Sequence, residues 1–162
     1  MIILGIDPGL AIVGWGVIEC NGSKLTTLGY GAIETPAHTL TEDRLLLIHK
    51  GMRELIERYH PDEMAVEELF FNTNITTGIR VAEARGVILM SAHAMGVKIS
   101  EYTPLQVKQA VCGYGRAEKA QVQRMVASPG WAAAVESGSP RMPSAVPKSP
   151  WAVFFVSEPV GV

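Results

Sequence analysis

An apolar run that stops at an acid and a tight turn constrains the fold of this chain more than any other feature. Residues 2–6 are aliphatic or glycine, Asp7 follows, and Pro8-Gly9 turns the chain so that residues 11–19 return beside the first strand. Such an antiparallel hairpin presents the Asp7 carboxylate on rigid backbone at the rim of a sheet, where a metal ion has access to it. The alternative is that Asp7 only helps to form the turn, which is a common use of Asp.

A second acidic position occurs in a short apolar strand predicted over residues 63–69. This strand carries Glu67 and Glu68 where an apolar run is expected to continue, and a carboxylate that points into a core is costly unless it is paired or bound to a metal. Neighbouring strand residues face opposite ways, so Glu67 and Glu68 do not share one site. Glu67 faces away from Val66 and is the better partner for Asp7. The alternative is that both glutamates face solvent at a strand end.

The composition predicts one globular domain with a substantial core. The chain has 162 residues, of which 48% are hydrophobic and 19% charged. No apolar run approaches the roughly 20 residues that a membrane span needs, and the N-terminal strand is too short for a signal peptide. Cys20 and Cys112 lack metal-site spacing, and the four histidines form no cluster. We therefore expect a cytoplasmic protein with free thiols and no membrane partner.

The periodicity predicts a mixed α/β sheet. Three strands joined by short connections pair in antiparallel fashion, and helices then alternate with further strands. Thr41 is expected to cap the first helix, whose apolar stripe includes Ile48 and Met52. The expected strands cover 2–7, 11–19, 24–34, 63–69 and 97–102; the expected helices begin near 41 and 75, with short ones from 104 and 117.

The charge is distributed unevenly along the chain. Residues 1–79 hold eleven acids and five bases, whereas residues 80–124 hold seven bases and three acids. An acidic pocket for divalent cations beside a basic flank for the phosphate backbone is typical of a nuclease. A pair of merely solvated helices is the alternative explanation for the basic flank.

The motifs of this chain are Gly5-Ile6-Asp7-Pro8-Gly9, Gly14-Trp15-Gly16, Val66-Glu67-Glu68-Leu69-Phe70, Ala84-Arg85-Gly86, and residues 106–111, 113–119 and 121–126. Together they resemble the RuvC-type Holliday-junction resolvases. The resemblance runs from residue 1 to about 127 and implies a ribonuclease-H-like fold. It also implies a homodimer that cuts four-way DNA junctions with magnesium during recombination and repair. Branch-migration helicase machinery is the partner that the resemblance implies. The actin-like ATPases share the opening Gly-Ile-Asp-x-Gly, but they need a much longer chain.

The resemblance assigns roles to individual residues. Asp7 and Glu67 fall on the first two catalytic carboxylates, which hold metal. Two ions about 3.5–4 Å apart activate water and stabilise the leaving oxygen. Lys119 is expected to support the developing charge. The alternative for the lysines is that they only bind backbone phosphate, and the alternative for Phe70 is a position in the core. The expected DNA-binding residues are Phe70, Arg85, Lys108, Arg116 and Lys119.

The resemblance stops near residue 127. The family ends in a helix with an Asp-x-x-Asp or His-x-x-Asp pair, yet this chain has no Asp after Asp62 and no His after His93. Residues 128–162 contain six prolines and six serines. We expect a nuclease domain over 1–127 without its final helix, and an atypical tail over 128–162 that a reading-frame change would explain. A cleavage-defective junction-binding protein, with its second metal site incomplete, is therefore the alternative function.

Overall fold

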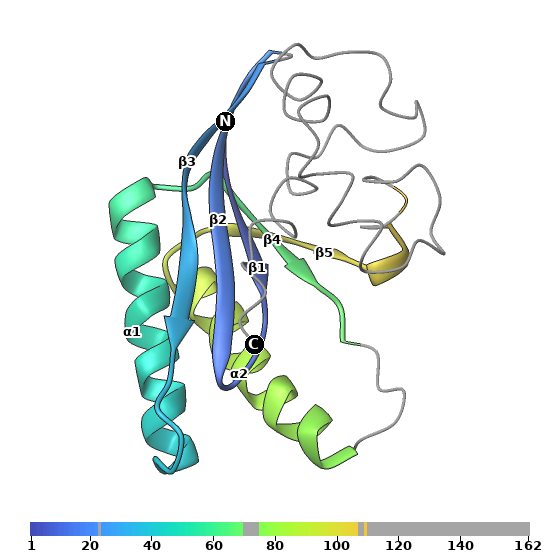
Figure 1. Ribbon diagram of the computed structural model, residues 1–162. Helices are drawn as coiled ribbons and strands as arrows, with labels where there is room; N and C mark the ends of the chain where they lie inside the picture. The colour runs from blue at the N-terminus through green and yellow to red at the C-terminus, as the bar shows by residue number, and fades with distance from the viewer. Residues whose placement is uncertain (23, 70–74, 107–108, 110–162) are drawn as a thin grey trace.

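The computed structural model describes residues 1–22, 24–69, 75–106 and 109, and gives no side-chain description for 24, 25 and 75–77. These residues form a five-stranded sheet in the order β3-β2-β1-β4-β5 with two long helices (Figure 1). The mixed α/β architecture predicted from the sequence is confirmed. In chain order the elements are β1 (Ile2–Asp7), β2 (Ile12–Asn21), β3 (Lys24–Glu34), α1 (Thr41–Tyr59), β4 (Glu63–Glu67), α2 (Ile75–Ala94) and β5 (Lys98–Tyr102).

The sheet has an antiparallel half and a parallel half. β2 pairs antiparallel with both β1 and β3, as two short connections require, whereas β4 pairs parallel with β1 and β5 pairs parallel with β4. The carboxyl ends of β1, β4 and β5 therefore meet at one edge of the sheet.

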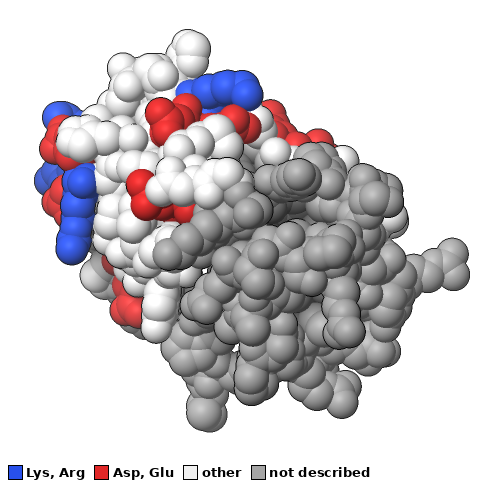
Figure 2. All heavy atoms as spheres, turned by 90° about the horizontal axis from the view of Figure 1, so that it is seen from above, with Lys and Arg blue, Asp and Glu red and all other residues white. Residues whose placement is uncertain are grey.

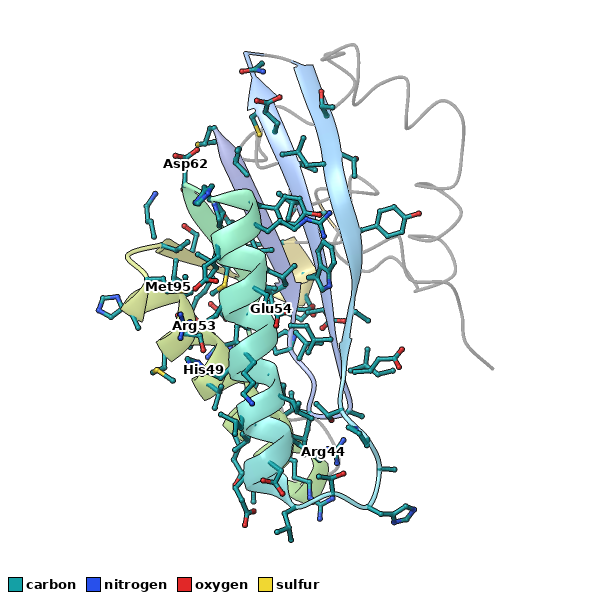
Figure 3. All side chains as sticks on the ribbon, turned by 90° about the vertical axis from the view of Figure 1, so that its left-hand side faces the viewer. Arg44, His49, Arg53, Glu54, Asp62 and Met95 are labelled. Atoms are coloured by element: carbon teal, nitrogen blue, oxygen red, sulfur yellow. The ribbon has the colours of Figure 1, made fainter. Side chains whose placement is uncertain are left out.

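One face of the sheet packs against both helices. Alternate strand residues such as Leu4, Ile6 and Val66 point to this face and are almost wholly buried. α1 contributes Ile48, Met52 and Ile56 to the same core, and α2 contributes Ala84, Ile88 and Ala92. Figures 1 and 3 show the two helices side by side on this face. We call it the helix face of the sheet.

Two details differ from the sequence prediction. Thr41 does not cap α1: the cap position is Leu40, no side chain caps the helix, and Thr41 is its first residue. Glu42 and Asp43 still lie in the first turn, where the helix dipole favours acids. β4 ends at Glu67 rather than at residue 69, because Glu67 is the last β4 residue that pairs with β5.

The remaining elements agree closely with the prediction. Strand β5 begins one residue later than expected, at Lys98, and α2 has the expected length of 20 residues. The helix expected after 104 is described only at residues 104–106 and 109, and the helix expected from 117 lies outside the described residues. Within the described part of the chain, neither helix is long and apolar enough to cross a membrane.

Candidate metal centre at the ends of two parallel strands

Asp7 and Glu67 end two adjacent parallel strands. The described β1–β4 pairing finishes with Ile6 opposite Val66, and each acid is the next residue along its strand. Ile6 and Val66 point into the helix face, so the two carboxylates project from the opposite face. Both acids are partly buried. The fold thus brings together the two residues that the sequence paired.

Small residues lie beside Asp7 on the same face of the sheet. Gly14 of β2 lies opposite Asp7, and Gly5 lies between Gly16 and Ala65 on the neighbouring strands. None of these residues has a side chain longer than a methyl group. Tyr102 of β5, by contrast, lies opposite Glu67. The described neighbours on this face are thus small beside Asp7 and large beside Glu67.

The turn after Asp7 is fixed from two directions. No residue with a side chain fits at position 9, because a Cβ atom on Gly9 would lie 2.3 Å from the carbonyl oxygen of Ile12. On the other side, the buried Thr35 donates its hydroxyl to the carbonyl of Leu10 at 2.6 Å. Arg44 Nε of α1 donates to the same hydroxyl oxygen at 2.8 Å. Figure 3 shows Arg44 at the N-terminal end of α1. The turn that carries Asp7 is therefore linked to the helix layer.

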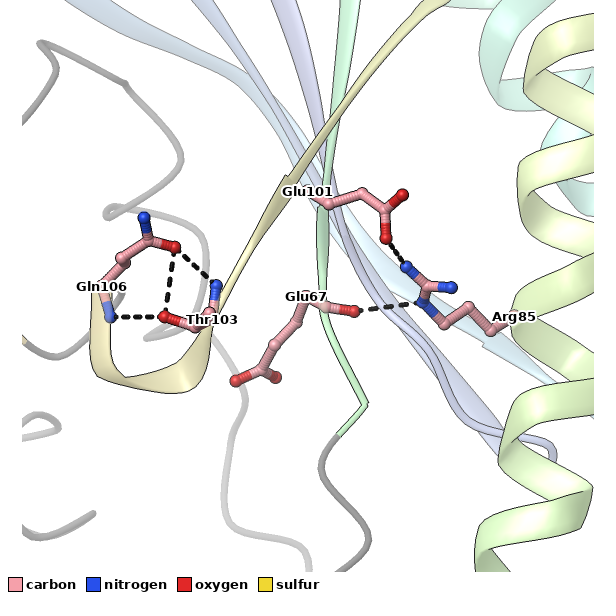
Figure 4. A network of polar contacts seen from close by, with 5 residues as sticks. All are labelled: Glu67, Arg85, Glu101, Thr103 and Gln106. Atoms are coloured by element: carbon pink, nitrogen blue, oxygen red, sulfur yellow. Dashed lines mark hydrogen bonds and ion pairs between the residues drawn. The ribbon is translucent and has the colours of Figure 1, made fainter.

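The end of β4 is fixed in a similar way. Glu68 N donates to the carbonyl of Tyr102 at 2.8 Å, which extends the β4–β5 ladder by one bond. Arg85 of α2 donates through Nε to the carbonyl of Glu67 at 3.4 Å and forms an ion pair with Glu101. In Figure 4 the Glu67 carbonyl faces Arg85, whereas its carboxylate points away. Arg85, expected from the sequence to bind DNA, contacts protein here.

A capping box begins the helix that follows β5. Gln106 N donates to Thr103 Oγ1 at 3.1 Å, and Thr103 N donates to Gln106 Oε1 at 2.8 Å (Figure 4). The reciprocal pair satisfies two backbone donors. We did not predict this box, although the Thr-x-x-Gln pattern at 103–106 is its sequence signal. We also did not predict that Thr35 and Arg44 fix the turn after Asp7, and no local sequence pattern indicates this role.

The basic flank is only partly described. Arg80, Arg85 and Lys98 lie in the described residues, whereas Phe70, Lys108, Arg116 and Lys119 lie outside them. Lys98 Nζ pairs with Glu63 Oε2 at 3.0 Å. A hydrogen bond from Ser100 lowers the pKa of Glu63, burial partly opposes this, and the hydrogen bond and charge of Lys98 lower the pKa further. Figure 2 shows acids and bases intermingled on the described part of one face.

The donor set at the strand ends suits a hard cation. Carboxylate oxygens are ligands that Mg²⁺ prefers, and Mg²⁺ usually keeps several waters beside one or two protein carboxylates. Among the described residues no group of three or more His, Cys, Asp or Glu could hold a metal ion. Asp7 and Glu67 offer carboxylate oxygens of the kind that such an ion binds.

The mixed sheet, with a strand-end acid pair on the face away from α1 and α2, defines the chain as a ribonuclease-H-like domain. It superposes on the Thermus thermophilus RuvC structure with a TM-score of 0.72 at 31% identity, covering 96% of this chain and 92% of that one. The T. thermophilus RuvC in complex with Holliday junction substrate gives a TM-score of 0.75 at 29% identity, covering 96% and 91%.

The chain belongs to the family Crossover junction endodeoxyribonuclease RuvC, which matches residues 3–128. It is 59% identical over 126 residues to the family member of Halothermothrix orenii, covering 78% of this chain and 76% of that protein. The member of Clostridioides difficile is 56% identical over 128 residues, covering 79% and 76%. The resemblance stated from the sequence motifs is thereby confirmed.

Proposed function

We propose that this chain is a structure-selective endonuclease that resolves four-way (Holliday) DNA junctions by magnesium-dependent hydrolysis of a phosphodiester bond. The observation that carries the proposal is the pair Asp7 and Glu67, which projects from one face of the sheet at the ends of adjacent parallel strands. Membership of the RuvC family and the junction complex of the T. thermophilus relative support the choice of substrate.

In this mechanism Asp7 and Glu67 hold Mg²⁺, with two ions expected per site. When bound, the ions polarise the scissile phosphate and supply an activated water. The chain's own residues hold and orient the DNA: Lys108 and Arg116 neutralise backbone phosphates, and Phe70 contacts bases at the junction centre. Lys119 stabilises the charge that develops on the phosphate. The proposal includes a cytoplasmic location, and family membership extends it to cooperation with branch-migration helicase machinery.

A homodimer is part of the proposal, since a four-way junction has two strands to cut. α2 supports it with an exposed stripe at helical spacing: Ile79 is 55% exposed, Met90 is 51% exposed, and Gly86 between them leaves open space. We expect Met90→Glu to shift the chain to monomer in sedimentation experiments. Leu28→Glu, at an exposed apolar residue of β3, is the matched control.

A cleavage-defective junction-binding protein is the second candidate. It is favoured by one observation: the family match ends at residue 128, and the sequence beyond contains no Asp or His. We propose that residues 1–127 form the nuclease domain and that a reading-frame change explains 128–162. Translating the gene in the other two frames after codon 127 tests this, because an Asp-x-x-Asp or His-x-x-Asp helix should then appear.

The decisive experiment compares the chain with Asp7→Asn on a labelled four-way junction. Binding is measured in Ca²⁺, and cleavage in Mg²⁺. Paired nicks that Asp7→Asn abolishes support the endonuclease. Binding without nicks supports the second candidate, and the absence of preferential junction binding over a linear duplex contradicts both.

A further inference from the structure

Arg85 lies on the side of the sheet opposite the candidate metal centre. Its ion-pair partner Glu101 is registered beside Val66, which is 1% exposed and points into the helix face. The Glu67 carboxylate projects from the other face. A phosphate held at that carboxylate thus lies on the other side of the β4 backbone from the Arg85 guanidinium.

The Arg85 guanidinium is also engaged within the protein. Its side chain is 17% exposed, and its charge is matched by Glu101, whose side chain is 46% exposed. The Nε–H is aimed at the Glu67 carbonyl, with an Nε···O distance of 3.4 Å (Figure 4). An arginine committed to a carboxylate and a backbone carbonyl is poorly available for a DNA phosphate. Its rigid fork suits bridging two groups, which a lysine does less well.

The carbonyl that Arg85 contacts belongs to the last residue of β4. The described pairing of β4 with β1 stops one residue earlier, at Val66. Beyond that point the Glu68 amide bonds to Tyr102 on the β5 side, and Arg85 bonds to the Glu67 carbonyl from the helix layer. The orientation of this peptide determines where the Glu67 Cβ points. A displacement of about 1 Å at a catalytic group costs on the order of a hundredfold in rate.

We propose that Arg85 is a positioning residue: it ties α2 to the ends of β4 and β5 and thereby holds the Glu67 carboxylate in place for metal binding. The expected effects on cleavage rest on the proposed function. The geometry rests on the contacts of Arg85 with Glu67 and Glu101. This positioning role replaces the DNA-binding role that the basic flank suggested for Arg85.

The test uses Arg85→Gln, Arg85→Lys and Glu101→Gln in the full chain. Arg53→Gln is the matched control, because Arg53 forms an exposed ion pair with Glu57 on α1. Three quantities are measured for each: junction affinity in Ca²⁺ at two salt concentrations, single-turnover cleavage against Mg²⁺ concentration, and hydrogen exchange of the Glu68 amide. Chemical unfolding verifies that each variant is folded.

We expect Arg85→Gln to keep junction affinity within about twofold while cleavage falls about 10- to 100-fold and requires more Mg²⁺. Arg85→Lys should recover part of the rate, and Glu101→Gln should lose rate in the same direction. Arg53→Gln should resemble the unmodified chain. A DNA-binding Arg85 predicts the reverse: weaker binding with a salt slope smaller by about one, and tighter binding for Glu101→Gln. That pattern would overturn the proposal.

Hydrogen exchange separates failure of this proposal from failure of the proposed function. If the unmodified chain does not nick the junction, the endonuclease function fails, yet the Glu68 amide still reports on the strand end. Faster exchange in Arg85→Gln and Glu101→Gln, but not in Arg53→Gln, supports positioning by Arg85. Unchanged exchange in all variants contradicts it.

Discussion

Two helix-interior glycines should respond to the same substitution with opposite signs. A Cβ atom at Gly51 of α1 would lie 2.8 Å from Ile33 Cδ1 and 3.0 Å from both Cγ1 and Cγ2 of that side chain. A Cβ atom at Gly86 of α2 would meet nothing within 4 Å. Gly→Ala gains helix propensity at both positions, but only at Gly51 does the added methyl meet a packed neighbour.

The magnitudes decide the signs. Replacing an interior helical glycine by alanine is worth about 1 kcal/mol in favour of the helix. Overpacking a core contact costs about 1–3 kcal/mol. Ile33 is β-branched and stiff at χ1, and both its Cγ atoms are close, so rotation does not clear the clash. In the Met90→Glu background, where the proposed subunit contact of α2 is broken, we expect Gly86→Ala to stabilise the subunit by about 1 kcal/mol. We expect Gly51→Ala to destabilise it by about 0–2 kcal/mol.

Urea unfolding of both variants measures these changes. A double-mutant cycle of Gly51→Ala with Ile33→Ala isolates the contact, because Ile33→Ala removes all three crowding atoms. We expect a favourable coupling of about 1 kcal/mol or more in the double variant. If Gly51→Ala stabilises the chain as much as Gly86→Ala does, the close packing of α1 on β3 is refuted.

Three further changes test the structure around the acids. Gly9→Ala places a methyl against the Ile12 carbonyl, which is backbone and cannot swing away; we expect loss of metal-dependent cleavage with reduced stability, measured by nicking and by thermal unfolding. Thr35→Val removes the hydroxyl between the Asp7 turn and α1; we expect about 1–3 kcal/mol of destabilisation in urea. The pKa of Glu63 is lowered chiefly by a hydrogen bond from Ser100. The charged Glu63 therefore stabilises the fold above its ordinary pKa of 4.5, and this contribution is lost as the pH falls through the lowered pKa. Between about pH 6 and about pH 3 we expect the unmodified chain to lose more stability than Ser100→Ala.

Each of these has a contradicting result. Wild-type cleavage by Gly9→Ala would mean that the turn has an alternative conformation. An unchanged unfolding midpoint for Thr35→Val would mean that water replaces the hydroxyl. Parallel stability curves against pH for Ser100→Ala and the unmodified chain would mean that Ser100 does not stabilise the charged form of Glu63.

The strands and helices were predictable because their signals are local. The apolar run that stops at Asp7 predicted β1 with its observed bounds, and the stripe that includes Ile48 and Met52 predicted α1. The pairing of Asp7 with Glu67 was also within reach, since it needs only strand ends and side-chain alternation. Each of these inferences depends on residues that are close in sequence or share one simple geometric rule.

The environment of Arg85 was not predictable in this way. In the sequence Arg85 is one of seven bases in a short stretch, and that pattern is typical of a DNA-binding surface. Glu101 lies sixteen residues after Arg85 along the chain. Their contact depends on the register of β5 on β4, which puts Glu101 opposite Val66. Composition reports the number of charges but not which face of the sheet each one occupies.

The two acids and their supports lie on opposite sides of the sheet. Arg44 reaches the Asp7 turn from α1 through Thr35, and Arg85 reaches the Glu67 peptide from α2. Neither arginine needs to share a face with the carboxylate that it helps to fix. The helix layer therefore determines the relative position of the two strand ends, while the opposite face stays free of competing positive charge from these two side chains.

Because Gly86 and Met90 of α2 form the proposed subunit contact, association of two chains would stiffen the same helix that anchors Glu67. A monomeric Met90→Glu variant should then lose protection of the Glu68 amide, which links the dimer proposal to the geometry of the acid pair.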